Sequence, residues 1–274
     1  MIPLKDNIST NHFPVVTVAV IAICLVAFIL QMATSGKAGS APSPQLAKVG
    51  YSARDQQTFE YGVIPREITH PGTYCAPLSG STATCGKRET VQRLTGVNPA
   101  PWYLALITSM FMHANLLHIL FNMLFLWIFG SNVEDSMGRG RFVAFYLIGG
   151  VAATYIQALF NLSGFDSTLP QIGASGAIAA VLGGYLLLYP RARVLTVVFI
   201  FFFFTFVEIP AALMLGVWLL LQFIPAVGQQ AVGSASGGVA YFAHIGGFAV
   251  GLALIHLFAK RRRELPPLSP YPVY

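Results

Sequence analysis

Charged residues are scarce in this chain. Lysine, arginine, aspartate and glutamate make up 9% of its 274 residues, whereas 55% are hydrophobic. An ordinary soluble domain carries roughly 25% charged residues. The composition therefore excludes a soluble globular domain and predicts a polytopic membrane protein.

The chain also lacks a basic patch of the kind that binds nucleic acid. Its net charge is +6, but the basic residues lie in short loops and in the cluster 260–263 rather than on one face interleaved with aromatic side chains. This distribution argues against nucleic acid as a partner. The first partner that we expect is the lipid bilayer.

Six apolar stretches are long enough to cross a bilayer, which takes about 20 residues. They cover 14–33, 113–133, 142–160, 173–189, 207–227 and 239–259. The first has small residues near its end, as a secretory signal would, but its apolar part exceeds the roughly 7 to 15 residues of a signal core. We therefore expect an all-α membrane protein that crosses the bilayer six times and forms one domain, 1–274.

Basic residues alternate between the loops in a way that predicts orientation. They follow spans two, four and six at Arg139, Arg141, Arg191, Arg193 and 260–263. The alternate loops, 161–172 and 228–238, contain no Lys or Arg. By the positive-inside rule, both termini and the tail 260–274 are expected to be cytoplasmic, and spans two, four and six begin at the outer face.

A long loop, 34–104, is expected to face outward. It is rich in Gly, Pro, Ser and Thr, and its basic residues do not contradict the orientation because long loops cross membranes largely regardless of charge. Two of the three cysteines in the chain, Cys75 and Cys85, lie in it. An oxidising compartment favours a disulfide between them, and the alternative is two reduced thiols.

A serine between small residues is the first candidate for chemistry. Ser175 lies in Gly-Ala-Ser-Gly-Ala at the start of the fourth span, and His244 lies in Ala-His-Ile-Gly-Gly at the start of the sixth. Polar groups inside hydrocarbon are costly and often mark functional sites. If the two side chains meet, His244 can take the proton of the Ser175 hydroxyl, and the pair can act as nucleophile and base.

A second pair of polar residues lies near the start of span two. His118 and Asn122 are four residues apart and share one helix face. Together with the backbone N–H of Ser175, they can donate hydrogen bonds to the oxyanion of a tetrahedral intermediate. Because no carboxylate is expected at the same depth, the pattern predicts a dyad rather than a triad.

Each of these residues also has a less specific interpretation. A Gly-Ala-Ser-Gly run is often a helix-packing surface, and Gly247 and Gly251 have the small-xxx-small spacing that fits one. An isolated histidine is more often a hydrogen-bonded packing residue. His113, His118 and His244 could bind zinc, but no Cys or carboxylate joins them and H-E-x-x-H is absent. We therefore expect no metal and no other cofactor.

The region after span four contains two apolar runs, 194–207 and 211–223. If each run crossed the membrane, His244 would lie on the opposite side from Ser175. We therefore expect a single crossing here. The preceding piece, 194–206, is then an interfacial or partly re-entrant segment.

Three runs of sequence together resemble the rhomboid family of intramembrane serine proteases. They are His-Ala-Asn-Leu-Leu-His-Ile-Leu-Phe-Asn at 113–122, Gly-Ala-Ser-Gly at 173–176 and Ala-His-Ile-Gly-Gly at 243–247. The resemblance covers about 108–259 and implies a six-helix core. It also implies that the substrates are single-span or polytopic membrane proteins, cut near the outer face beside small side chains without metal or ATP.

The resemblance also implies a role for each candidate residue. Ser175 is the nucleophile and His244 the general base, His118 and Asn122 support the oxyanion, and His113 lines the same cavity. For a bacterial member of the family, the expected location is the plasma membrane.

Two acidic residues are expected to be structural. Glu208, at the inner end of span five, is expected to pair with Arg191 or Arg193, and the alternative is that it gates this span. Glu134 begins a Glu-x-x-x-Gly-Arg run, 134–139, that looks like a turn of the family.

Two positions depart from the family pattern. Trp102 is followed by Tyr103 where many members have Arg, so the sequence leaves open how the outer loop is anchored. Ala179 stands where many members have an aromatic residue that stacks on the base, so it also leaves open what orients His244.

Two other functions compete with proteolysis. An inactive rhomboid-like protein would bind membrane clients, but such proteins typically lack the serine or the histidine, and this chain has both Ser175 and His244. A small transporter is disfavoured because the sequence shows no paired broken helices and no buried acid–base relay.

Overall fold

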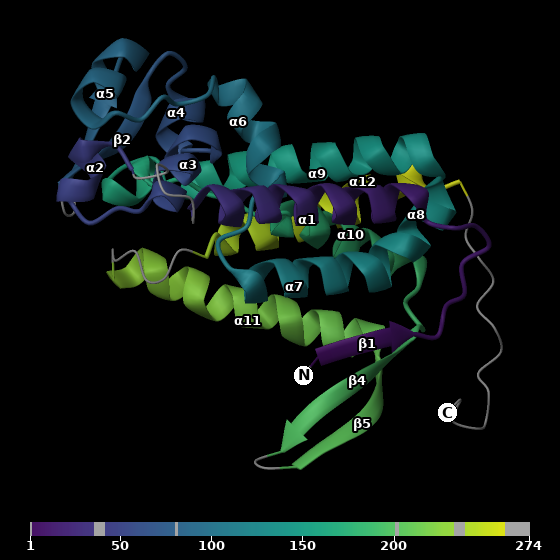
Figure 1. Ribbon diagram of the computed structural model, residues 1–274. Helices are drawn as coiled ribbons and strands as arrows, with labels where there is room; N and C mark the ends of the chain where they lie inside the picture. Colours follow the sequence, from purple (N-terminus) through teal and green to yellow (C-terminus); the bar gives the residue numbers. More distant parts are fainter. Residues whose placement is uncertain (1, 36–41, 80–81, 201–202, 233–238, 261–274) are drawn as a thin grey trace.

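The protein is a helical bundle with a small subdomain, formed by residues 42–79 and 82–100, at one end and a β-hairpin, 193–210, at the other (Figure 1). The computed structural model describes residues 2–35, 42–79, 82–200, 203–232 and 239–260. Of the predicted tail, 260–274, only Lys260 is described, and 233–238 of the predicted loop 228–238 also lie outside the described residues.

Five of the described helices are long and apolar enough to cross a membrane. The bundle consists of α1 (Val15–Ser35), α7 to α8 (Leu116–Met137), α9 (Arg139–Phe160), α10 (Ser175–Leu188), α11 (Ala211–Val232) and α12 (Tyr241–Phe258). Helix α10 has 14 residues. At 1.5 Å per residue it is roughly 21 Å long, less than the roughly 30 Å thickness of the hydrocarbon core.

The shorter elements connect these helices. They are β1 (Ile2–Asp6), α2 (Pro44–Lys48), α3 (Ala53–Tyr61), α4 (Pro65–Thr69), β2 (Tyr74–Ser79), β3 (Thr82–Gly86), α5 (Arg88–Thr95), α6 (Trp102–Thr108), η1 (Ser109–Phe111), η3 (Phe165–Thr168), β4 (Arg193–Ile200) and β5 (Phe203–Pro210). The bundle helix Leu116–Met137 itself consists of α7 (Leu116–Phe125), the π-helical turn η2 (Leu126–Gly130) and α8 (Ser131–Met137).

The predicted class, a helical polytopic membrane protein, is confirmed, but the protein also contains two small antiparallel sheets that the sequence did not predict. One has the strand order β1-β4-β5 and the other is the hairpin β2-β3. The run 194–206 therefore lies largely in strands, and α11 begins only at Ala211, after β5. Apolar runs of this length do not distinguish a strand from a buried helix by periodicity, and the pairing of β4 with β1 joins segments nearly 200 residues apart.

Helix α10 lies at the centre of the bundle, and nearly all of its side chains are buried. Small residues allow α12 to approach it closely. A Cβ atom on Gly251 would overlap the carbonyl oxygen of Ala180, and one on Gly183 would overlap that of Phe248. A Cβ atom on Gly247 would likewise overlap the carbonyl oxygen of Gly176, so the glycines next to the candidate serine and histidine also serve helix packing, as the less specific interpretation expects.

Glu134 has the structural role that the sequence predicts. Its buried carboxylate accepts hydrogen bonds from the N–H groups of Val16 and Thr17, at 2.9 and 2.7 Å, and from the Thr17 hydroxyl at 2.8 Å. The first N–H groups of a helix have no partner within the helix, so this carboxylate caps α1. Gly138, with a φ of 80°, then reverses the chain between α8 and α9.

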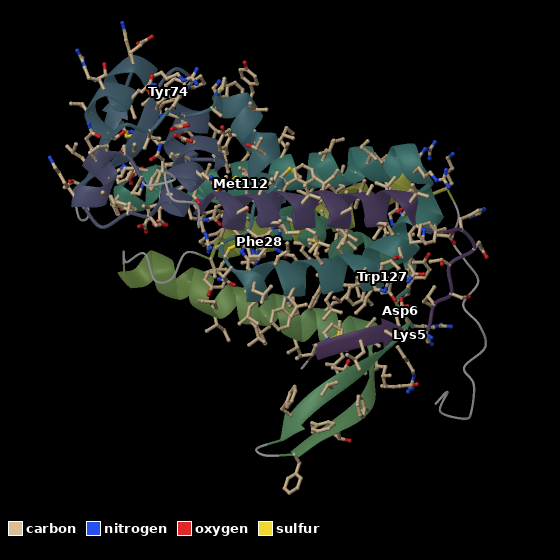
Figure 2. All side chains as sticks on the ribbon, viewed as in Figure 1. Lys5, Asp6, Phe28, Tyr74, Met112 and Trp127 are labelled. Atoms are coloured by element: carbon tan, nitrogen blue, oxygen red, sulfur yellow. A yellow bond between two sulfur atoms is a disulfide. The ribbon has the colours of Figure 1, made fainter. Side chains whose placement is uncertain are left out.

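The hairpin end is fixed by polar contacts at the base of the sheet. Asp6 accepts hydrogen bonds from Tyr185 Oη at 2.6 Å and from Asn132 Nδ2 at 2.7 Å. Figure 2 shows Asp6 at this end and Tyr74 in the subdomain at the other. Arg193 pairs with Glu208 across the hairpin at 3.9 Å, which confirms the expected partner of Glu208.

The subdomain packs on the bundle through apolar side chains. Val63, Ile68, Leu106 and Ala158 form a buried cluster against which Trp102 packs. This contact anchors α4 beside α6 and α9 although position 103 is Tyr rather than Arg.

Candidate active site

Ser175 is the first residue of the short central helix α10, so its hydroxyl lies at the N-terminal end of that helix. The turn before it needs a glycine. Gly173 has a φ of 134°, and a Cβ atom there would lie 2.8 Å from Nε2 of His118. The N–H of Gly173 donates to the carbonyl of Ser109 at 2.8 Å, which holds this turn against η1.

The structure brings Ser175 and His244 into contact. His244 lies in the first turn of α12, and its Nε2 is 2.7 Å from Ser175 Oγ. The two residues are 69 positions apart in the sequence. The close packing of α10 on α12 places both side chains at the same end of the bundle.

His118 and Asn122 lie on one face of α7, as their spacing predicts. Asn115 caps this helix by accepting a hydrogen bond from the His118 N–H at 2.9 Å, and this bond sets the first turn. Nδ2 of Asn122 is buried and has no hydrogen-bond partner among the described residues. A buried donor without a partner is costly, so this amide is available to a bound group.

These four side chains line one cavity. Its volume is about 590 Å³, and Ser175, His244, His118 and Asn122 all contribute to its wall. His113 does not have the place that the family resemblance implies. It is fully buried, it packs edge-on against the ring of His118 at 5.1 Å between ring centres, and it is not among the described residues that line the cavity.

The subdomain also reaches the cavity. Arg54, Asp55 and Thr58 of α3 contribute to its wall, and Arg54 Nη1 donates to the carbonyl of Ala114 at 3.3 Å, in the turn before α7. The long loop is therefore not a separate appendage, because one of its helices borders the space in front of Ser175.

Sequence reasoning missed two residues of α11 that contact His244. Oε1 of Gln222 is 2.8 Å from Nδ1 of His244, and the ring centre of Trp218 is 5.9 Å from that of the imidazole. A signal was present, because Gln222 is a polar residue inside an apolar span and Trp218 precedes it by one helical turn.

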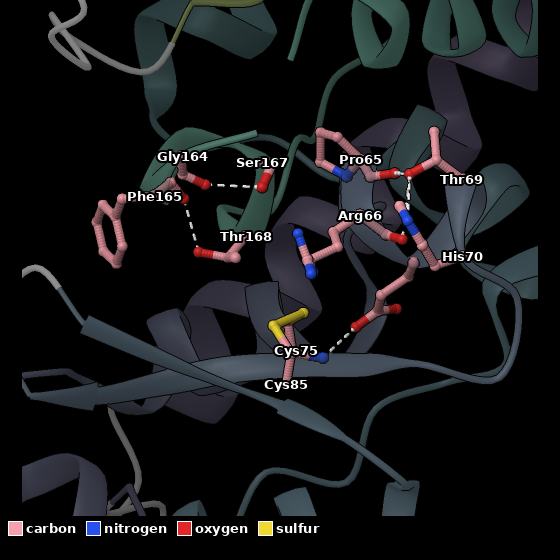
Figure 3. Close-up of a disulfide and its surroundings, with 11 residues drawn as sticks. Pro65, Arg66, Thr69, His70, Cys75, Cys85, Gly164, Phe165, Ser167 and Thr168 are labelled. Atoms are coloured by element: carbon pink, nitrogen blue, oxygen red, sulfur yellow. Dashed lines mark hydrogen bonds between the residues drawn. A yellow bond between two sulfur atoms is a disulfide. The ribbon is translucent and has the colours of Figure 1, made fainter. Parts of the chain in front are cut away.

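Cys75 and Cys85 form a disulfide (Figure 3). They lie opposite each other in the β2–β3 hairpin. The N–H of Cys75 donates to the carboxyl group of Glu67 at 2.8 Å. Burial raises the pKa of Glu67 to about 8, because the charged form loses its hydration.

Comparisons with known proteins show similarity to one family. A model of the rhomboid domain matches residues 101–261, more than half of the chain. Mitochondrial rhomboid protein 1 of Saccharomyces cerevisiae is 31% identical over 54% of this chain and 40% of its own length. Mitochondrial presenilin-associated rhomboid-like protein A of Danio rerio is 36% identical over 33% of this chain and 23% of its own length.

A bacterial relative is also similar. The rhomboid protease GluP of Bacillus subtilis is 38% identical over 30% of this chain and 15% of its own length. The matched region of this chain thus spans less than half the length of each of these three relatives.

The location expected from the sequence, a bacterial plasma membrane with both termini in the cytoplasm, is contradicted by the mitochondrial relatives, which point to the mitochondrial inner membrane. The matching proteins of yeast, zebrafish and cattle are mitochondrial. Apolar spans and alternating basic loops indicate how many times a chain crosses a membrane and in which orientation. They do not distinguish one membrane from another, so they do not determine in which membrane this chain lies.

Proposed function

The chain belongs to the rhomboid family, and on this premise we propose that it is an intramembrane serine endopeptidase with Ser175 as nucleophile and His244 as general base. Membership of the family implies intramembrane protease activity. The observation that carries the proposal for this chain is the 2.7 Å contact between Ser175 Oγ and His244 Nε2. Both residues line a cavity, which provides space for the backbone of a substrate.

The reaction begins when Oγ of Ser175 attacks the carbonyl carbon of a peptide bond and its proton passes to Nε2 of His244. The C–N bond then breaks, His244 gives the proton to the leaving amine, and an ester to Ser175 remains. Water attacks this ester, again with His244 as base, and restores the serine. All atoms come from the protein, the substrate and one water molecule.

The tetrahedral intermediates carry a negative charge on the former carbonyl oxygen. The backbone N–H of Ser175, the side-chain amide of Asn122 and the imidazole of His118 are the donors that we assign to it. The unpartnered Nδ2 of Asn122 supports this role. His118 accepts a long hydrogen bond of 3.5 Å from the N–H of Ala114 at Nδ1, which leaves its Nε2 to carry the proton and donate it.

The substrates that we propose are membrane proteins with one or several spans, cut close to the membrane face that carries the subdomain. The first turns of α7, α10 and α12 lie at that end. Because α10 is shorter than the hydrocarbon core is thick, we expect Ser175 to lie within the depth of the bilayer. A substrate segment that enters the cavity there would contact α7 and α11 of the bundle and α3 of the subdomain.

A fluorophosphonate probe tests the proposal directly. The full chain in detergent or lipid should be labelled, and Ser175→Ala should not. Ser163→Ala, which removes an exposed hydroxyl in the loop after α9, is the matched control and should label normally. Equal labelling of wild type and Ser175→Ala would refute Ser175 as the nucleophile, and an unlabelled wild type that still binds membrane clients would favour the inactive alternative.

Cleavage itself needs a second measurement. A model single-span protein incubated with the enzyme in liposomes should yield products whose ends, mapped by mass spectrometry, lie near the subdomain face. A cut in a soluble segment distant from the membrane would contradict the proposed substrate position.

A further inference from the structure

Two side chains of α11, Trp218 and Gln222, contact the imidazole of His244 on the side away from Ser175. Residues four apart share one helix face. Here the shared face presents an indole 5.9 Å from the imidazole, tilted by 34°, and an amide oxygen 2.8 Å from Nδ1. The base therefore touches a third helix in addition to its own α12 and the nucleophile's α10.

The orientation of the Gln222 amide is fixed by its second hydrogen bond. Nε2 of Gln222 donates to the carbonyl oxygen of Trp218 at 3.2 Å. The reversed amide would place two oxygens against each other, because a carbonyl can only accept. Oε1 is therefore the atom that faces His244, and an amide oxygen can only accept as well.

The tautomer of His244 follows from this acceptor. Since Oε1 cannot donate, Nδ1 of His244 carries the proton and donates it to Gln222. A neutral imidazole holds one proton, so Nε2 is left as an acceptor for the Ser175 hydroxyl at 2.7 Å. This is the tautomer that a general base needs.

We propose that Gln222 is the positioning residue of the catalytic base: its side-chain oxygen holds His244 in the Nδ1–H tautomer and at the angle that presents Nε2 to Ser175. This proposal rests on the proposed function. In soluble serine proteases, a buried aspartate performs this task. A neutral amide fits an apolar span better, because an unpaired carboxylate in hydrocarbon is far more costly than a hydrogen-bonded amide.

Helix packing explains why the support comes from α11. Position 179, one turn after Ser175, is a fully buried alanine, and a Cβ atom on Gly247 would already lie 3.2 Å from Ala179 Cβ. Alanine at this position has no ring that could stack on His244. Trp218 supplies the ring contact from α11 instead.

If Gln222 positions His244, the orientation and the tautomer of His244 depend on the position of α11. Most of this helix faces away from the rest of the bundle, and Pro225 interrupts its hydrogen bonding just after Gln222. A shift of α11 away from α12 separates Oε1 from Nδ1, after which His244 is free to change tautomer. The orientation of His244 that this proposal describes therefore requires that α11 packs against α12.

The kinetic test uses three variants of the full chain in liposomes. Gln222→Met keeps the length of the side chain and removes the acceptor, and we expect kcat to fall roughly 10²-fold, within the range that a general base contributes, while KM changes less than twofold. Gln222→Glu restores an acceptor and should recover most of kcat, with the acid limb of the pH–rate profile displaced to higher pH. Leu220→Met, on the exposed side of α11, is the matched control and should behave as wild type.

A spectroscopic readout separates this proposal from the proposed function. In ¹⁵N NMR spectra of histidine-labelled protein, His244 should show a protonated Nδ1 and an unprotonated Nε2, and Gln222→Met should lose this pattern. If the tautomer is as expected but wild type cleaves nothing, the proposed function fails and the positioning contact stands. If Ser175→Ala abolishes cleavage but Gln222→Met leaves kcat, the pH profile and the tautomer unchanged, Gln222 has no positioning role.

Discussion

Gly247 of α12 lies directly against Gly176 of α10, so closely that a Cβ atom on Gly247 would overlap the carbonyl oxygen of Gly176. Each glycine is near a candidate catalytic residue: Gly176 follows Ser175, and Gly247 lies one turn after His244. The distance between the two helices therefore determines the distance between hydroxyl and imidazole.

Gly247→Ala should separate Ser175, the proposed nucleophile, from His244, its proposed base. The added methyl group cannot be accommodated without moving α12 away from α10, and a displacement of about 1 Å at reacting groups can cost roughly 10²-fold in rate. We expect kcat to fall by that order and the thermal midpoint to fall by several degrees. Cleavage of the model substrate and thermal unfolding in detergent measure the two effects.

Gly216→Ala is the control for this prediction, because nothing lies within 4 Å of a Cβ atom at that position on α11. Gly216→Ala should leave both kcat and the thermal midpoint unchanged. Full activity in Gly247→Ala would mean that the two helices can separate without disturbing the site.

Asn122→Ala should lower turnover without weakening the fold. Its Nδ2 has no partner among the described residues, so its removal loses a donor to the oxyanion and no native hydrogen bond from that atom. Loss of one oxyanion donor typically costs about 10²- to 10³-fold in kcat. Kinetics with the model substrate, together with expression level and thermal midpoint, test this, and unchanged kcat would remove Asn122 from the oxyanion site.

Glu67 should make the stability of the protein pH-dependent. Its pKa is about 8 in the folded protein and 4.5 is its ordinary value, so between these values the folded state holds a proton that the unfolded state has released. The free energy of unfolding therefore falls as pH rises through this window, by at most about 1.4 kcal/mol per pH unit from this group.

Glu67→Gln should flatten this dependence. The amide oxygen can still accept the N–H of Cys75, and the variant carries no charge at any pH. Thermal midpoints at pH 5, 6.5 and 8 should fall with pH for wild type and for the exposed control Glu89→Gln, and less steeply for Glu67→Gln. Parallel curves for all three proteins would contradict the assignment.

The hairpin formed by β4 and β5 is predicted to lie at the membrane surface. Phe203 is 80% exposed and Phe204 64%, and the charged pair of the hairpin, Arg193 with Glu208, lies at its base. Apolar side chains at such exposure are stabilised by the interfacial region of a bilayer. A fluorophore attached through Phe204→Cys should be quenched by brominated lipids, whereas one attached through Leu78→Cys in the subdomain should not. Equal quenching at both positions would contradict this placement.

The sequence was most informative where function depends on local pattern. Ser175 was recognisable because it is a polar residue between small residues at the start of an apolar stretch. His118 and Asn122 were recognisable because a spacing of four places both on one face of α7. Such features follow from helix geometry, which any chain obeys regardless of what surrounds it.

The sequence was least informative where a contact depends on which helices are neighbours. Gln222 has no partner within its own span other than the carbonyl of Trp218, so nothing near it in the chain indicates His244. His113 shares the family motif with His118, yet it is buried behind that ring rather than on the cavity wall. The strands of 193–210 depend on pairing with residues 2–6 at the far end of the sequence.

By itself, the sequence determined that this is a membrane-spanning helical protein of the rhomboid family, because hydrophobic length and short motifs are properties of adjacent residues. Only the tertiary structure decided that Ser175 contacts His244, that α11 supplies the acceptor for Nδ1, and that α3 borders the cavity. Those contacts join residues from different helices, so they exist only in the packed bundle. The first of them also depends on how closely glycines let the backbones of α10 and α12 approach.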